Sequence, residues 1–341
     1  MNKTIYLSNK SYLNEDYLDI KKKIRLNFLK KKKIIISGSS GGLGLYLINF
    51  LLFLNEKFNY KIKIIAITRN PLIFEKKIFY KRDELKILKI NINKQKIKTS
   101  LKSDYFFHLS SPVDPKKYAK YPGKIILDIV NSTNTVIDYL KKNNKTKLIF
   151  SSSSEIYVKK IFNINNINNF KANNSYALGK IISEFMFINE IKNKQKIINL
   201  RLFNFFSPLE SLKNSRIIPN MIYQSIKNKN LKIQSDGKCF RYFSYVKDVV
   251  ISIFILLNKN VKKNIIDVGN PKNKISIKKL GKEILKLNNI SEKKIIIKNL
   301  INGTKGVKPD IKILKSKGFK PELNLKKELK RVFLFQKKNF R

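Results

Sequence analysis

Short apolar runs alternate with longer helical segments from residue 34 to residue 203, and this alternation limits the fold more than any other feature of the chain. The apolar runs are rich in isoleucine, leucine and phenylalanine and have the length of buried strands. The segments between them have helical apolar spacing, most clearly at residues 43–54, at residues 125–144 and around Tyr176. The pattern predicts an α/β fold with a doubly wound parallel sheet. The strands are expected at residues 34–37, 61–68, 84–91, 103–110, 147–154 and 195–203.

The pattern changes on either side of this region, which indicates further units. Residues 1–30 are polar and basic, and we expect a short helix there that packs on the body through Leu18, Arg25, Leu26 and Leu29. After residue 204 the elements become shorter and are separated by proline and glycine. We therefore predict a dinucleotide-binding domain at residues 31–204, with a return to the sheet near residues 244–257 that brings in residues 242–270. A smaller α+β substrate lobe is expected from residues 205–241 and 271–335.

The chain is strongly basic, with 73 Lys and Arg against 23 Asp and Glu and a net charge of +50. Such a charge would suit a nucleic acid or an anionic membrane surface. The excess is nearly all lysine, however, and it is spread over the whole chain together with isoleucine and asparagine, which share A/T-rich codons. We therefore favour a mutational bias over a nucleic-acid partner. The charge still favours a polyanionic substrate.

Two absences in the sequence bear on the compartment. The single cysteine, Cys239, excludes an internal disulfide framework and suits a reducing compartment. The longest apolar stretch, residues 43–54, is broken by Asn49 and is short for a membrane span. Without a signal peptide at the start, a cytoplasmic protein with no membrane span is expected.

The glycine-rich segment "SGSSGGLG" lies between the first predicted strand and the first predicted helix. Glycines permit a tight turn and a close approach of the backbone to a pyrophosphate, and the amides at the start of the following helix face that anion. The spacing of Gly38, Gly41 and Gly44 departs from the usual dinucleotide motif but still indicates a Rossmann-type site. We expect the cofactor to contact Gly38, Ser40, Gly41, Gly42, Leu43 and Gly44.

The ends of the next two strands bear on the choice of cofactor. An acidic residue after the second strand would bind the adenosine ribose and favour NAD, but this chain has Arg69 there. Arg69 could hold the 2′-phosphate of NADP, stack on adenine or remain in solvent. Asn91 and Ile92 end the third strand beneath the expected adenine. NAD is the predicted cofactor, with NADP possible.

Tyr176 and Lys180 are one helical turn apart, in "SYALGK". A free tyrosine has a pKa near 10 and is a poor base, but a neighbouring ammonium stabilises the phenolate and lowers that pKa. A serine from the "FSSSSEIY" run would complete the site, since the carboxyl ends of parallel strands form the ligand-binding edge of such sheets. The three groups together predict proton and hydride transfer at a hydroxyl carbon.

The order of these segments and of "LRLFNFFSP", "RIIPNMI", "SDGKCFRYFSYVKDVV" and "KPDI" resembles the NAD-dependent epimerase/dehydratase family over nearly the whole chain. These are extended short-chain dehydrogenases that act on nucleotide sugars, and the UDP-glucuronate decarboxylase-like subgroup is the most similar. The resemblance implies a homodimer with a four-helix interface that includes the helix of Tyr176. It also implies these site residues: Ser153, Tyr176, Lys180 and Glu155 as catalytic, Leu109 and Ser110 at the cofactor, and Ser153, Asn204, Arg216 and Arg241 at the substrate.

The chain departs from two specialised branches of the family. Dehydratases of this family use an Asp after the catalytic Ser or Thr, and here Ser154 stands in its place before Glu155. Decarboxylases use an Arg where "GVKPD" has Val307, although Lys305 or Lys308 could substitute. We therefore expect oxidation at sugar carbon 4 followed by epimerisation or a related conversion, with decarboxylation and 4,6-dehydration as alternatives.

Two readings of another kind stay open: an inactive relative that binds a dinucleotide as a regulator, and a basic binder of nucleic acid or membrane surface. The only histidine, His108, has no cluster of partners, so no metal site is expected, and we expect it to pack at a strand end.

Overall fold

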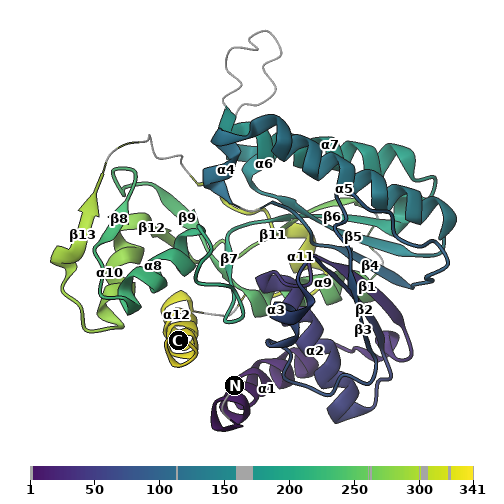
Figure 1. Ribbon diagram of the computed structural model, residues 1–341, viewed down its shortest axis with the longest axis horizontal. Coiled ribbons are helices and arrows are strands. Elements are labelled where there is room, and N and C mark those ends of the chain that lie inside the picture. Colours follow the sequence, from purple (N-terminus) through teal and green to yellow (C-terminus); the bar gives the residue numbers. More distant parts are fainter. Residues whose placement is uncertain are drawn as a thin grey trace.

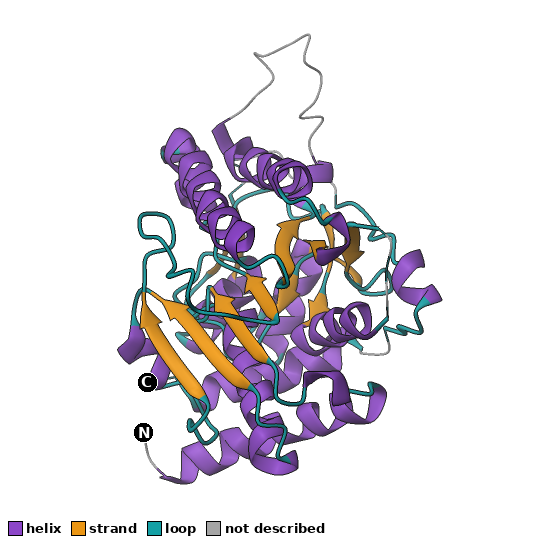
Figure 2. Cartoon of the chain, turned by 90° about the vertical axis from the view of Figure 1, so that its right-hand side faces the viewer, coloured by secondary structure: helices purple, strands orange, loops and turns teal. Residues whose placement is uncertain are grey.

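A computed structural model of the chain describes residues 3–112, 114–158, 172–259, 261, 263–298, 300, 306–321 and 324–340. Within these ranges the centre is a parallel sheet of seven strands in the order β11-β6-β5-β4-β1-β2-β3 (Figures 1 and 2). The order reverses at β1, as expected for a doubly wound sheet, and the predicted α/β fold is confirmed. The strands are β1 (Lys33–Ser37), β2 (Lys63–Thr68), β3 (Leu85–Lys89), β4 (Tyr105–His108), β5 (Lys147–Ser153), β6 (Ile197–Leu202) and β11 (Ile265–Val268).

Helices cover both faces of this sheet (Figure 1). The helices α2 (Gly42–Phe58) and α9 (Val246–Asn258) share the larger apolar core with one face, and α5 (Pro122–Lys142) and α7 (Ser175–Glu190) pack on the other. Short helices lie near the carboxyl ends of the strands: α3 (Pro71–Glu75), α4 (Pro115–Lys120) and α6 (Glu155–Val158). No helix in the described part of the chain has the length and apolar character needed to cross a bilayer.

The expected return to the sheet is present, but it lies at residues 265–268 rather than at residues 244–257. Residues 246–258 form α9, and the strand that joins the sheet is β11, beside β6. The run "VVISIFILL" is apolar on every side, and periodicity does not distinguish a buried strand from a buried helix in such a run. In the structure this run is buried throughout as a helix between α1 and the sheet.

A smaller lobe follows β6 and contains short sheets and three helices in its described residues (Figure 1). The division of the chain at residues 204, 241 and 270 stays a prediction. The elements of this part are β7 (Phe205–Phe206), α8 (Ile217–Ile226), β8 (Leu231–Ile233), β9 (Phe240–Tyr242), β10 (Ser244–Tyr245), β12 (Lys274–Ser276), α10 (Ile277–Lys286), β13 (Ile295–Ile297) and α12 (Leu325–Lys338); α11 (Lys312–Ser316) lies against α9.

The N-terminal extension is a longer helix than expected. The helix α1 (Lys3–Lys23) has 21 residues, and a single 3₁₀ turn at Asn27–Leu29 follows it. Leu18, expected to pack on the body, is 43% exposed, whereas Leu13, Tyr17 and Ile20 are fully buried. The apolar residues of α1 are only weakly segregated to one side, so the sequence does not predict which face is buried. Contacts with α2, α9 and α12 determine that face.

The Asp16 cluster consists of Asp16, Tyr46, Tyr245, Lys247 and Arg331, and it fixes α1 in place. The carboxylate of Asp16 is 1% exposed and accepts hydrogen bonds from the Tyr46 and Tyr245 hydroxyls. It forms ion pairs with Arg331 of α12 at 2.9 Å and with Lys247 of α9 at 3.5 Å. One buried carboxylate therefore joins α1 to both the sheet layer and the C-terminal helix.

Candidate active site

The turn between β1 and α2 has the geometry of an anion-binding loop. Gly38 has φ +74, and a Cβ there would lie 2.6 Å from the carbonyl carbon of Leu109, so only glycine fits. The N-cap of α2, Gly41, has no side chain to satisfy the first amides of the helix. Amides without a side-chain acceptor at the start of a helix suit the pyrophosphate of a dinucleotide. The residues of this turn therefore fit the predicted cofactor.

Several other residues expected at the cofactor lie next to this turn. The Ser40 hydroxyl lies 2.6 Å from that of Thr68, which ties the turn to the end of β2. The Leu109 backbone packs against Gly38 and continues into Ser110. Leu43 is 5% exposed, so its side chain lies in the core and only its backbone is available.

The residues expected near adenine differ in how far they are exposed. Arg69 is exposed just beyond β2, where it can reach a ribose or an adenine ring. Asn91 follows β3, and its side chain accepts a hydrogen bond from the Asn93 amide. Ile92 is 4% exposed and belongs to the core beneath the sheet, so mainly its backbone is available to a cofactor.

Ser153, Tyr176 and Lys180 come together at the carboxyl edge of β5. Ser153 ends β5, and its hydroxyl accepts a hydrogen bond from the Glu155 amide at 3.2 Å. The Lys180 ammonium lies 5.7 Å from the centre of the Tyr176 ring. The hydroxyls of Ser111 and Ser153 face the phenol and lower its pKa. The structure thus gathers the groups that the sequence predicted to share one site.

The pKa of Tyr176 runs against the sequence-based expectation. Burial raises this pKa above 10, the Glu155 carboxylate raises it further, and Arg216 lowers it together with the two serines. The expected lowering by Lys180 does not prevail, and the ammonium of that lysine is bound to other groups. It donates a hydrogen bond to the Ser151 carbonyl at 2.6 Å and lies 4.5 Å from the centre of the Phe150 ring.

Lys180 is itself strongly perturbed. Its side chain is 0% exposed, and burial lowers its pKa to about 7, with the Glu184 carboxylate acting in the opposite direction. A lysine with such a pKa exchanges its proton near neutral pH. It can therefore supply positive charge or accept a proton during a reaction.

Tyr118 is a part of the site that the sequence did not reveal. Its ring stacks on that of Tyr176, with centroids 4.9 Å apart and planes at 7°. Burial raises its pKa, and the neighbouring Tyr176 and Glu155 raise it further. The stack fixes the plane of the Tyr176 ring. Only the aromatic residue in "DPKKY", just after the fourth strand, could have indicated this contact.

Of the residues expected to bind substrate, Arg216 lies near Tyr176, while Asn204 and Arg241 lie on the segment after β6 and on β9. Arg216 acts electrostatically on Tyr176, and its guanidinium lies 4.5 Å from the centre of the Phe205 ring. It also pairs with the buried Glu210 at 2.7 Å, which was not expected. Asn204 follows β6 and binds the Ser244 amide through its carbonyl. Arg241 lies on β9 beside Gly306.

The segment that replaces the decarboxylase arginine is partly described. Val307 is partly buried and Lys308 is exposed, while Lys305 lies outside the described residues. Asp310 donates its amide to the Asp267 carboxylate of β11 at 3.1 Å. The segment is therefore attached to the sheet near the site.

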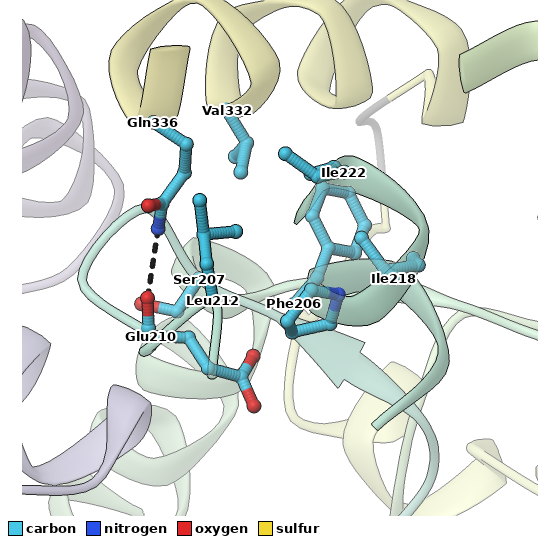
Figure 3. A pocket seen from close by; sticks show the side chains of 9 residues that line it. Phe206, Ser207, Glu210, Leu212, Ile218, Ile222, Val332 and Gln336 are labelled. Atoms are coloured by element: carbon cyan, nitrogen blue, oxygen red, sulfur yellow. Dashed lines mark hydrogen bonds between the residues drawn. The ribbon is translucent and has the colours of Figure 1, made fainter. Parts of the chain in front are cut away.

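A hollow beside the lobe does not belong to this site (Figure 3). Gln336 of α12 donates hydrogen bonds to the carbonyls of Pro208 and Glu210, while the Glu210 carboxylate points away from Gln336 towards Arg216. Apart from Ser207 the rest of the lining is apolar, which indicates packing rather than ligand binding. It is formed by Phe206, Ser207, Glu210, Leu212, Ile218, Pro219, Ile222, Val332 and Gln336.

His108 is a packed, neutral residue, as predicted. It is buried at the end of β4, with Nδ1 2.8 Å from the Ser37 hydroxyl, and burial lowers its pKa to about 3. Over the described ranges no three His, Cys, Asp or Glu side chains lie close enough together to hold a metal ion.

Comparisons with known proteins agree with this geometry. Residues 34–269 match the model of the NAD dependent epimerase/dehydratase family. UDP-glucuronic acid decarboxylase 3 of Arabidopsis thaliana is 26% identical over 305 residues, which cover 87% of this chain and 86% of the relative.

Solved structures share the fold at lower identity. A UDP-N-acetylglucosamine 4-epimerase from Methanobrevibacter ruminantium M1 superimposes with a TM-score of 0.75 at 22% identity, over 90% of this chain and 98% of the other. A UDP-glucuronic acid 4-epimerase from Bacillus cereus, solved with NAD, gives 0.76 at 20% identity, over 90% of this chain and the whole of the other.

Proposed function

The chain is an enzyme of the NAD-dependent epimerase/dehydratase family, and from this membership we propose that it oxidises a nucleotide-linked sugar at carbon 4 and later reduces it again. The 4-keto sugar formed in between is planar at carbon 4, so return of the hydride to its other face inverts that carbon. Its acidified neighbouring position would serve the related conversions. NAD is the proposed cofactor and would accept and return the hydride when bound. The protein side chains bind the sugar and move its protons.

Tyr176 is the proposed base that takes the proton from the sugar 4-hydroxyl. Ser153 donates a hydrogen bond to the same oxygen, and Lys180 stabilises the negative charge that develops on the phenol. Because burial raises the pKa of Tyr176 in the protein alone, positive charge must increase around the phenol when the ligands bind. Glu155 faces the same phenol and is placed to move a second proton in the keto intermediate.

A single observation carries this proposal: the Ser153 hydroxyl faces the phenol of Tyr176, and the Lys180 ammonium lies 5.7 Å from the centre of the same ring, at the sheet edge that also holds the Gly38 turn. A structural tyrosine–lysine pair on a helix face would not need a serine at the end of the neighbouring strand. It would also not need an anion-binding turn beside it.

The nucleotide end of the substrate is assigned to Arg216, Arg241 and Asn204. Guanidinium groups bind phosphate oxygens in pairs, which suits a nucleoside diphosphate. Arg216 keeps donors available beside its bonds to Glu210 and the Phe205 carbonyl. The relatives and solved neighbours named above act on UDP-sugars, which supports this substrate class.

Epimerisation at carbon 4 is the favoured outcome. The position of the dehydratase aspartate holds Ser154, which is a poor acid, and Val307 cannot pair with a sugar carboxylate. Decarboxylation of UDP-glucuronate is the second candidate, because the matched Arabidopsis relative carries that name. Release of CO₂ from UDP-glucuronate would favour this second candidate.

Two further assignments belong to this proposal. Arg69 leaves NADP possible as the cofactor. Calorimetry that compares the dissociation constants of NAD and NADP decides between the two.

A homodimer through α5 and α7 is supported by Leu127 and Phe185, which are 60% and 68% exposed on these helices. Phe185→Glu should then convert the dimer to monomer in light scattering.

The decisive experiment combines a panel of UDP- and dTDP-sugars with the Tyr176→Phe variant. We expect one panel member to be converted, with product identification by NMR, and kcat to fall about 10²–10⁴-fold in the variant because the base is lost. Cofactor affinity should change little.

Tyr223→Phe is the matched control, since that ring packs on Phe340 of the C-terminal segment. It should retain full turnover. Comparable turnover in Tyr176→Phe would exclude the assignment of the base.

A further inference from the structure

A buried ion pair that the proposed mechanism does not use lies behind the catalytic strand. Glu184 of α7 and Arg201 of β6 are joined by two hydrogen bonds, of 2.7 Å to Nη2 and 3.0 Å to Nε. Their side chains are 5% and 18% exposed. We propose that Glu184, held by Arg201, is a positioning residue that keeps Lys180 protonated and in place for the proposed C4 oxidation.

Glu184 follows Lys180 by one helical turn and Tyr176 by two, so the three side chains share one face of α7. Both of its oxygens are occupied, because the Ser152 hydroxyl also donates to Oε1. Ser152 directly precedes the catalytic Ser153 in β5. The carboxylate therefore fixes the relative position of the helix that carries Tyr176 and the strand that carries Ser153.

Arg201 extends this connection to two further segments. Its Nη1 donates to the Tyr157 hydroxyl at 2.9 Å, and its guanidinium lies 4.9 Å from the centre of that ring. Tyr157 donates in turn to Asp267 of β11 at 2.7 Å. Because Tyr157 lies two residues after Glu155, one guanidinium links α7, β5, α6 and β11 around the site.

The charged groups facing Lys180 show why Glu184 matters. On α7 these are Glu184 and the phenol of Tyr176. On β4 the neighbour is His108, which is neutral because burial lowers its pKa to about 3. On β5 the ammonium meets a carbonyl and the Phe150 ring, which are uncharged. Glu184 is thus the carboxylate that offsets the cost of burying this cation.

Arg201 fixes the position of the Glu184 carboxylate. Its guanidinium donates to both carboxylate oxygens, the bidentate geometry in which this pair is strongest. The charge that acts on Lys180 is therefore held in place by a residue of the neighbouring strand.

The test is a titration of Lys180 that needs no substrate. In protein labelled with ε-¹³C-lysine, NMR should show one lysine signal titrating near pH 7, far below the ordinary lysines near 10.4. Its absence in Lys180→Met assigns it. Glu184→Gln should lower its midpoint by about one pH unit, since an opposite charge is lost. Glu190→Gln, an exposed pair member on the same helix, should leave it unchanged.

A second variant keeps the test valid if Glu184→Gln does not fold. Glu184→Gln combined with Arg201→Gln leaves neither member of the ion pair as an unpaired charge, so it should fold and show the same acidic displacement. If the titration midpoint of Lys180 is unchanged in whichever variant folds, the proposal is overturned. Glu184 and Arg201 then have a structural role only. Because the proposal rests on the proposed function, kcat against pH is measured separately. A displaced NMR midpoint without any turnover would refute the function and not the charge effect.

Discussion

Lys180 and Asp16 are both buried ionisable side chains, but their surroundings differ in how many opposite charges they contain. Asp16 is contacted directly by Arg331, Lys247 and two tyrosine hydroxyls. Lys180 contacts an uncharged carbonyl and a phenyl ring, and the nearest carboxylate acts from one turn away. The first site is saturated with partners and the second is left short of them.

This difference corresponds to two uses of a buried charge. A carboxylate that is fully paired serves to join elements. An ammonium with few partners costs stability but keeps a pKa near 7, which is useful for chemistry. The comparison teaches that burial alone does not indicate function, whereas burial with incomplete pairing does.

The largest expected effect comes from Lys180→Met. Turnover should fall about 10²–10⁴-fold because the charge beside the base is lost. Stability at pH 6 should rise by roughly 2–4 kcal/mol, because a buried cation has been removed. Steady-state kinetics and urea denaturation measure the two effects.

The pH dependence of that stability gain has a definite sign. At pH 6 the folded and unfolded proteins both hold the Lys180 proton, so the folded state bears the full cost of the buried charge. Between about pH 7 and 10.5 the folded state releases this proton first, and the cost declines as the pH rises. The advantage of Lys180→Met should therefore disappear near pH 10. A constant advantage at all pH values would contradict the contrast drawn here.

Asp16→Asn tests the other side of the comparison. The change removes one of the two carboxylates that pair with Lys247, a side chain that is only 8% exposed. It also removes one carboxylate partner of Arg331. Stability should fall by about 3 kcal/mol, while kcat per folded molecule stays the same. Asp19→Asn, a half-buried neighbour on α1 that pairs with the same Lys247, should cost less than about 1 kcal/mol. Equal losses in both variants would show that the cluster is not centred on Asp16.

Lys141→Ala gives the smallest effect and sets the baseline. Lys141 on α5 pairs with Glu190 on α7 at 2.7 Å, but both side chains are 51% exposed. The stability change should stay below about 0.5 kcal/mol in thermal unfolding, because water screens the pair. A loss of stability as large as that of Asp16→Asn would show that solvent exposure does not decide how much an ion pair contributes to stability.

The sequence predicts the parts of the site that depend on local geometry. Tyr176 and Lys180 are close because four residues make one helical turn, and Ser153 lies beside them because parallel strands end at one edge. The direction of the Tyr176 pKa could not be predicted. It depends on the burial of the phenol, with Ser111 and Glu155 acting in opposite directions, and only the packed structure determines these surroundings.

The same division applies to the fold. Strands at residues 34–37 and 147–154 follow from apolar runs, and the structure contains both with small changes at their ends. The length of α1 did not follow, because its buried face is complementary to residues far along the chain. A signal for Glu184 and Arg201 was present, since Arg201 is a charge within the apolar strand "IINLRL".

The helix α1 also has a consequence for how the molecule is made. Asp16 finds its partner Arg331 across 315 positions, and Asn9 binds Asn339 across 330. Contacts between residues so far apart in the chain close very large loops, and the entropy of that closure has to be met before the contacts can stabilise the fold. Until α12 has folded, Asp16 lacks its ion pair with Arg331, and the attachment of α1 depends on its contacts with α2 and α9 alone.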